Sequence, residues 1–101
     1  MPENPKINLR IWILDQEPSD QVLDETTGEC FVKRDALALI LPLGAYYLAG
    51  GDYVNPLDAV VERIEYEERT NEIFLNLKLE SAGSFPMEYL LDPKNGWTQD
   101  T

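Results

Sequence analysis

The chain has 101 residues, 44% of them hydrophobic and 27% charged, and 19 acidic against 8 basic side chains give it a net charge of −11. This composition is typical of one globular domain. The charge argues against direct binding to nucleic acid or to an anionic membrane, because both attract Lys and Arg. We expect a disordered lead-in over residues 1–5, one domain over 6–98 and a polar tail over 99–101.

The first half of the chain predicts strands and one short helix. Residues 6–14, KINLRIWIL, alternate between two faces and predict a strand. Residues 22–32 predict two short strands around the turn Thr27-Gly28. Residues 35–41 favour a short helix, because Asp35 can cap it, Ala and Leu favour helix, and Pro42 would end it.

The middle of the chain predicts two hairpins. Gly50-Gly51 predicts a two-residue turn that places Leu48 opposite Tyr53. Residues 60–67 and 72–79 predict a second hairpin, with Glu67 opposite Glu72, Tyr66 opposite Ile73, and Val60 opposite Leu79. In this register Glu62 falls on the apolar side, and we interpret it as a residue at the rim or in a bulge.

Residues 85–91, FPMEYLL, predict a further strand, and DPKNG predicts a turn with Gly96 in the left-handed conformation. Six or seven short strands with frequent turns predict a mostly-β fold. We expect a small antiparallel barrel or sandwich built of hairpins, with at most one or two short helices; the alternative is α+β.

The residues that usually carry chemistry are sparse. The chain has no histidine, which removes the usual general base and the commonest zinc ligand. No glycine pattern for binding phosphates is present. The single cysteine, Cys30, excludes an internal disulfide and predicts a reducing, cytoplasmic location. We therefore expect a protein that is not an enzyme, although paired carboxylates could in principle support hydrolysis.

A binding module that engages a basic protein fits the charge best, in its sharpest form an inhibitor or a DNA mimic. The candidate contact residues are the acids at the tip of the second hairpin and three tyrosines of a type common at interfaces: Glu65, Glu67, Glu68, Glu72, Tyr46, Tyr47 and Tyr53. The simpler interpretation is that acids at a hairpin tip keep it soluble and unpaired.

Two alternatives stay open. A Ca²⁺ site would use acids from a stretch without Lys or Arg, namely Asp20, Asp24, Glu25 and Glu29, although the EF-hand spacing fails there. No other cofactor is expected. The other alternative is a structural subunit of a larger complex or of a homo-oligomer, in which neighbours cover apolar segments such as YYLAGGDYV.

Overall fold

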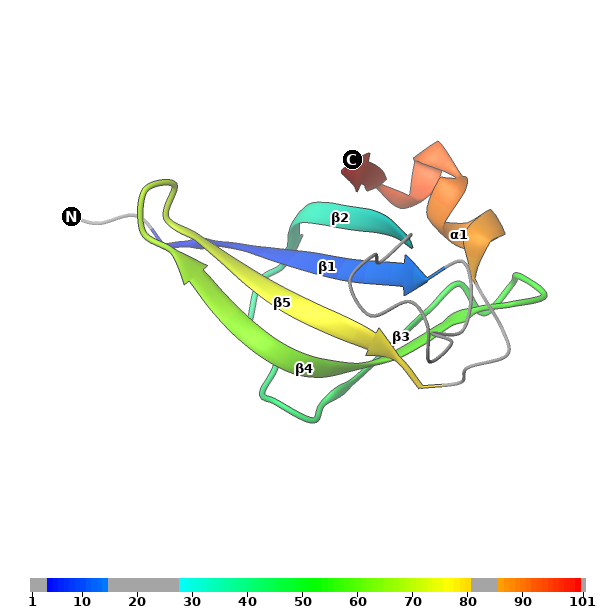
Figure 1. Ribbon diagram of the computed structural model, residues 1–101, viewed down its shortest axis with the longest axis horizontal. Coiled ribbons are helices and arrows are strands. Elements are labelled where there is room, and N and C mark those ends of the chain that lie inside the picture. Colours follow the sequence, from blue (N-terminus) through cyan, green and yellow to red (C-terminus); the bar gives the residue numbers. More distant parts are fainter. Residues whose placement is uncertain (1–3, 15–27, 81–85, 101) are drawn as a thin grey trace, which may run out of the picture.

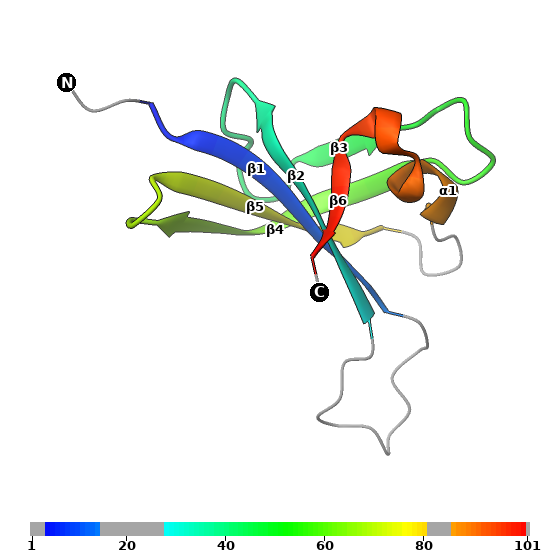
Figure 2. The same ribbon diagram turned by 90° about the horizontal axis from the view of Figure 1, so that it is seen from above.

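The computed structural model describes residues 4–14, 28–80 and 86–100. They form a mostly-β domain in which one mixed sheet curls into a half-barrel, as Figures 1 and 2 show. The sheet order is β3-β4-β5-β1-β2-β6, and β1 and β5 run parallel while all other neighbours are antiparallel. The elements are β1 Lys6–Leu14, β2 Gly28–Leu37, β3 Tyr46–Ala49, β4 Leu57–Glu67, β5 Glu72–Leu79, helix α1 Met87–Leu91, the 3-10 turn η1 Pro93–Asn95 and β6 Trp97–Asp100. The predicted mostly-β class with short helices is confirmed.

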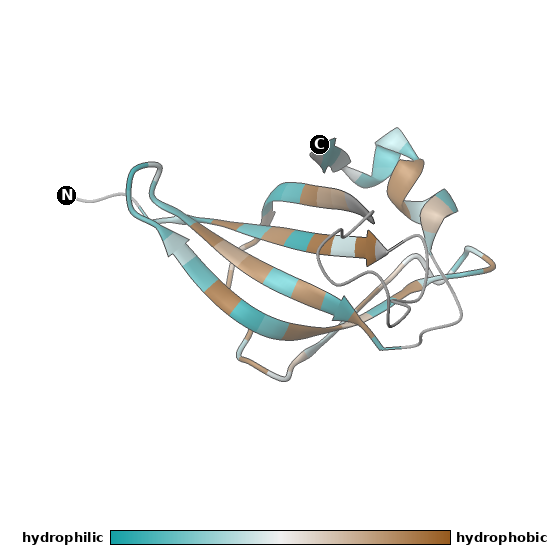
Figure 3. Ribbon diagram, viewed as in Figure 1, coloured by the Kyte–Doolittle hydropathy of each residue, from teal (hydrophilic) through white to brown (hydrophobic). Residues whose placement is uncertain are grey.

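The core lies on the inner face of the curled sheet. Alternation along β1, β4 and β5 places every second side chain inside, which Figure 3 shows as bands of opposite hydropathy. The buried residues of this cluster include Ile7, Leu9, Ile11, Ile13, Phe31, Leu57, Ala59, Val61, Leu75, Leu77, Leu90 and Trp97. A smaller cluster of Cys30, Val32 and Phe74 lies on the outer face.

The predicted hairpin of β4 and β5 is confirmed at its tip. Glu67 pairs with Glu72 and Tyr66 with Ile73, as expected. The predicted pairing of Val60 with Leu79 is wrong, because a bulge between Val61 and Arg63 shifts the register and Ala59 takes that place. The extra residue in the bulge is Glu62, which is exposed.

The predicted helix over residues 35–41 is wrong, because β2 continues to Leu37 and pairs with β1. Asp35 has φ +52° and lies in a second bulge, since Ile7 pairs with Leu37 and Leu9 with Lys33, a step of two positions in β1 against four in β2. Its N–H donates to Oδ1 of the fully buried Asn8 at 2.8 Å. The sheet partner therefore overrides the local helix propensity.

The two-residue hairpin at Gly50-Gly51 is also wrong. Strand β3 pairs with β4, so Leu48 lies opposite Asp58 rather than Tyr53. The connection occupies residues 50–56, where Gly50 takes φ +73° and its carbonyl accepts from the N–H of Tyr53 at 2.9 Å.

Residues 87–91 form helix α1 rather than the predicted strand. Pro86, Tyr89 and Leu90 are all buried, and the spacing i, i+3, i+4 places them on one side only if the segment is helical. The predicted turn that follows is confirmed, with Gly96 at φ +82°. After it, β6 takes in Gln99 and extends the sheet to Asp100.

Candidate binding surface

Three of the four candidate acids at the hairpin tip, Glu65, Glu67 and Glu72, are paired with arginines. Glu65 contacts Nη1 of Arg10 at 3.5 Å and Nη2 of Arg63 at 3.8 Å. Glu67 contacts Nε of Arg69 at 3.4 Å. Each of these pairs is at least partly solvated and so contributes little to stability, but each neutralises charge.

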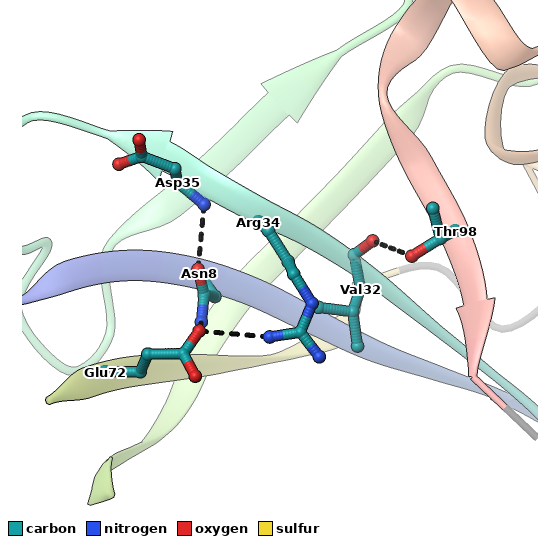
Figure 4. A network of polar contacts seen from close by, with 6 residues as sticks. All are labelled: Asn8, Val32, Arg34, Asp35, Glu72 and Thr98. Atoms are coloured by element: carbon teal, nitrogen blue, oxygen red, sulfur yellow. Dashed lines mark hydrogen bonds and ion pairs between the residues drawn. The ribbon is translucent and has the colours of Figure 1, made fainter. Parts of the chain in front are cut away.

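Glu72 is held in a more ordered network, drawn in Figure 4. Its Oε2 accepts from Nδ2 of Asn8 at 2.7 Å and from Nη1 of Arg34 at 3.0 Å. These contacts lower the pKa of Glu72, with the hydrogen bond from Asn8 the largest cause and Arg34 a smaller one. Because Asn8 also accepts from the backbone of Asp35, the network ties β1, β2 and β5 together.

Charge is therefore balanced at this end of the sheet. All four arginines of the chain pair with three of the four acids proposed for partner binding. Of those four, only Glu68 has no ion pair within the described residues. The tip is hydrophilic, as Figure 3 shows, and the contacts with arginines offset part of its negative charge.

The three candidate tyrosines lie far from the tip, on β3 and the loop that follows it. Tyr46 is on the outer face, 63% exposed, whereas Tyr47 points to the inner face and packs against the core. Tyr47 and Tyr53 line a hollow of about 600 Å³, which Tyr46 does not. The structure thus brings two of the three tyrosines together.

One wall of this hollow is a rigid aromatic cluster. Tyr53 and Tyr89 meet edge to face with ring centroids 5.7 Å apart, and Tyr89 meets Trp97 in the same way at 6.4 Å. Nε1 of Trp97 donates to the hydroxyl of Tyr89 at 3.0 Å. Gly50 lies so close to the ring of Tyr89 that a Cβ there would be 2.7 Å from it.

The polar groups of the hollow are mostly committed to one another. The hydroxyl of Tyr53 donates to Oδ2 of Asp92 at 2.7 Å and accepts from Nδ2 of Asn95 at 3.0 Å. Asp92 also contacts Nζ of Lys94 at 3.6 Å, and its pKa is lowered, chiefly by the Tyr53 hydroxyl. Lys33 and Asp52 are the exceptions, because both line the hollow and neither has an ion pair within the described residues.

A second, smaller hollow of about 440 Å³ lies beside the same strand. It is lined mainly by apolar groups and includes Leu48, Pro56 and Leu57. Both hollows contain Ala49 and Gly51, so they flank the end of β3 and the start of its loop.

Sequence reasoning missed Lys33, Tyr89 and Asn95, which are distant from β3 in the chain. It recognised only part of a longer signal, YYLAGGDYV at residues 46–54: residues 36–57 contain only one charged residue, Asp52, in a chain that is 27% charged. We call this stretch the β3 edge segment. Ten large hydrophobic side chains are exposed among the described residues, and the segment carries six of them: Leu39, Ile40, Leu43, Tyr46, Leu48 and Val54.

The proposed calcium ligands mostly fall outside what the structure describes. Three of them, Asp20, Asp24 and Glu25, lie outside the described residues. Glu29 is the second residue of β2, but its side chain is not among those described. Within the described residues, no group of three or more Cys, Asp or Glu is placed to hold a metal ion.

Comparison of the chain with protein-family models, curated proteins and solved structures gives no match. Among the described helices, none is both long and apolar enough to cross a membrane.

Proposed function

We propose that this chain is a non-enzymatic binding module that engages another protein through the β3 edge segment. One observation carries the proposal: of the ten large hydrophobic side chains exposed in the described part of the chain, six lie within 22 consecutive residues that contain a single charge. Depletion of charge with exposed aromatic and aliphatic groups is the composition of an interface core.

The position of the segment supports the same proposal. Strand β3 is the end of the sheet order, so its outer edge has no neighbouring strand among the described residues. Leu48 is 68% exposed and Val54 is 89% exposed, with a hollow on either side of the strand. Both side chains can enter an interface without any rearrangement of the core.

The partner expected from the charge alone was basic, and charge attraction stays part of the proposal. Its source is not the hairpin tip, because Glu65, Glu67 and Glu72 already contact arginines. We therefore expect the net charge of −11 to affect the rate of encounter, and the apolar segment to supply most of the affinity.

The test is affinity capture from native lysate with three forms of the chain at low and high salt. Leu48→Asp places a charge in the segment at an exposed position, and it should abolish capture without unfolding the chain. The matched control is the double substitution Glu62→Gln with Glu68→Gln, which removes two exposed acids that form no ion pair with any residue the structure describes. The control should retain the same protein.

The two sets of outcomes separate the apolar from the electrostatic mode. A protein that survives high salt and is lost only with Leu48→Asp supports the proposal. A protein that the Glu62 and Glu68 substitutions release, and that Leu48→Asp still binds, would place the contact on the acidic surface instead.

A further inference from the structure

The free edge of β3 has a defined set of unused backbone groups. The N–H of Val61 donates to the carbonyl of Ala45 at 2.9 Å, which makes this pair a hydrogen-bonded one. Hydrogen-bonded pairs alternate along an antiparallel ladder, so Tyr47 and Ala49 turn their backbone groups toward β4.

Tyr46 and Leu48 then turn their N–H and C=O groups to the free edge. Asp58 lies opposite Leu48, and its carbonyl accepts from the N–H of Glu80 at 3.0 Å, on the side of β4 that faces away from β3. The pair of Leu48 with Asp58 is therefore a non-hydrogen-bonded one, as this alternation requires. On the side that faces away from β4, the N–H and C=O groups of Tyr46 and Leu48 make no hydrogen bond to any described residue. The two N–H donors and two C=O acceptors of Tyr46 and Leu48 are therefore available to pair with another strand.

The larger hollow, which Tyr47 and Tyr53 line and which we call the inner hollow, lies beside this edge and offers unused donors of its own. Lys33 is partly buried and has no ion pair within the described residues, whereas Lys94 in the same hollow is paired with Asp92. Among the lysines without an ion pair in the described part of the chain, Lys33 is the one that is not exposed. A partly buried ammonium group attracts a carboxylate more strongly than an exposed one does.

The tyrosine hydroxyls add a second donor. Burial and the neighbouring Tyr89, to which its side chain is hydrogen bonded, raise the pKa of Tyr47, so its hydroxyl stays protonated at neutral pH. Tyr89 already accepts from Trp97. Tyr47 lines the hollow, so a protonated phenol group lies in the same hollow as Lys33.

We propose that the free edge of β3 binds an extended segment of the partner as an added strand, in which a residue with a carboxylate faces Lys33 and its neighbours in sequence are apolar. The inference rests on the proposed function and specifies its chemistry. Side chains of an added strand alternate between faces, so one enters the inner hollow and the next lies beside Leu48 on the outer face.

Two carboxylates of the hollow, Asp52 and Asp92, oppose a further carboxylate, and Lys94 offsets the charge of Asp92. Asp52 has no ion pair within the described residues. It lines the inner hollow but is exposed, so solvent screens it more than it screens Lys33. Replacing Asp52 with Asn should therefore strengthen the binding of an acidic segment.

The experiment titrates the chain with two peptides and follows backbone amides by NMR. The probes are acetyl-Val-Glu-Val-Glu-Val-amide and acetyl-Val-Lys-Val-Lys-Val-amide, which share strand propensity and differ in charge. Nonspecific attraction to a chain of net charge −11 favours the lysine peptide. A preference for the glutamate peptide, expected at about tenfold, must therefore come from the local field of Lys33.

Two readouts locate the peptide. The N–H signals of Tyr46 and Leu48 should move downfield, because they gain hydrogen bonds, while those of Tyr47 and Ala49, already bonded to β4, should move little. Lys33→Met should remove the preference for glutamate. Its matched control, Lys78→Met, removes an exposed lysine without an ion pair in the described residues and should leave the preference intact.

Equal or tighter binding of the lysine peptide, or a preference that survives Lys33→Met, would overturn the inference. So would dimerisation of the chain through β3 in sedimentation, because a second copy would then occupy the edge. Failure of the peptides while Leu48→Asp still abolishes capture would leave the proposed function standing and remove only the added strand.

Discussion

Asn8 is the polar residue on which the architecture depends most, and Asn8→Ala tests this directly. Its side chain is fully buried, donates to Glu72 and accepts from the N–H of Asp35. Truncation removes both bonds and leaves the Asp35 N–H without its partner inside a bulge. Two lost bonds, one of them to a charged group, should lower the free energy of unfolding by about 2–4 kcal/mol.

That loss is a large part of the roughly 5–15 kcal/mol that holds a small domain together. It corresponds to a fall in melting temperature of about 10–30 °C for a chain of this size. The assay is urea and thermal unfolding followed by circular dichroism. The matched control is Asn76→Ala on β5, because Asn76 also bonds a glutamate, Glu65, at 2.7 Å but is only half-buried.

We expect Asn76→Ala to cost about 1 kcal/mol or less, because water can replace its contacts. Equal losses for the two substitutions would refute the reasoning, since they would show that the bulge contact and the burial of Asn8 contribute nothing specific.

Three further expectations follow from the same contacts. Gly50→Ala should destabilise by about 2–4 kcal/mol, because a Cβ at φ +73° would lie 2.7 Å from the Tyr89 ring, whereas Gly51→Ala, with open space around it, should change unfolding by about 0.5 kcal/mol or less. Asp35→Gly should stabilise by about 0.5–1 kcal/mol in the same unfolding assay, because its φ of +52° is one that glycine adopts without strain. Because folding lowers the pKa of Glu72 from its usual value of 4.5, its carboxylate contributes stability above that pH, and the contribution is lost as pH falls through the folded pKa. Unfolding measured across an acid titration should show this loss, and the loss should be smaller in Asn8→Ala. An Asn8→Ala profile that parallels wild type through this range would contradict that link.

The parts of the fold that sequence predicted are those decided by local pairing. The tip of the β4–β5 hairpin has the expected register, because Tyr66 and Ile73 share a face and the turn is short. The only sign of the bulge at Glu62 in the sequence was an acidic residue at a position that the expected register turns toward the core. The exact effect of the bulge on the pairing of Val60 depended on both strands at once.

The errors arise where a distant residue decides. Asp35 belongs to a strand because Asn8, 27 positions earlier, accepts from its N–H, and no local pattern encodes that contact. The parallel pairing of β1 with β5 joins Ile7 to Ile73 across most of the chain, which hairpin logic cannot anticipate.

The candidate site divides in the same way. Tyr47 and Tyr53 were identified from residue type, since tyrosine is common at interfaces, and they do line the hollow. The role of Lys33 could not be predicted from sequence, because its inward position follows from its pairing with Leu9 and Trp97 on two separate strands. The contacts between three of the tip acids and arginines could not be predicted either, because net charge counted from sequence does not reveal which acids lie beside arginines.

The two edges of the same sheet offer a comparison that bears on the proposal. At β6 the side chains of Thr98 and Gln99 are polar and exposed, which is the usual protection of an edge against pairing. At β3 no side chain is charged, and Leu48 is exposed beside unused backbone groups. A strand of four residues is too short to template extended self-association, and the charge of −11 opposes it further. It is nonetheless long enough to hold one extended segment by the groups of Tyr46 and Leu48. The contrast between the edges is therefore expected of a domain that leaves one side open for a single partner strand.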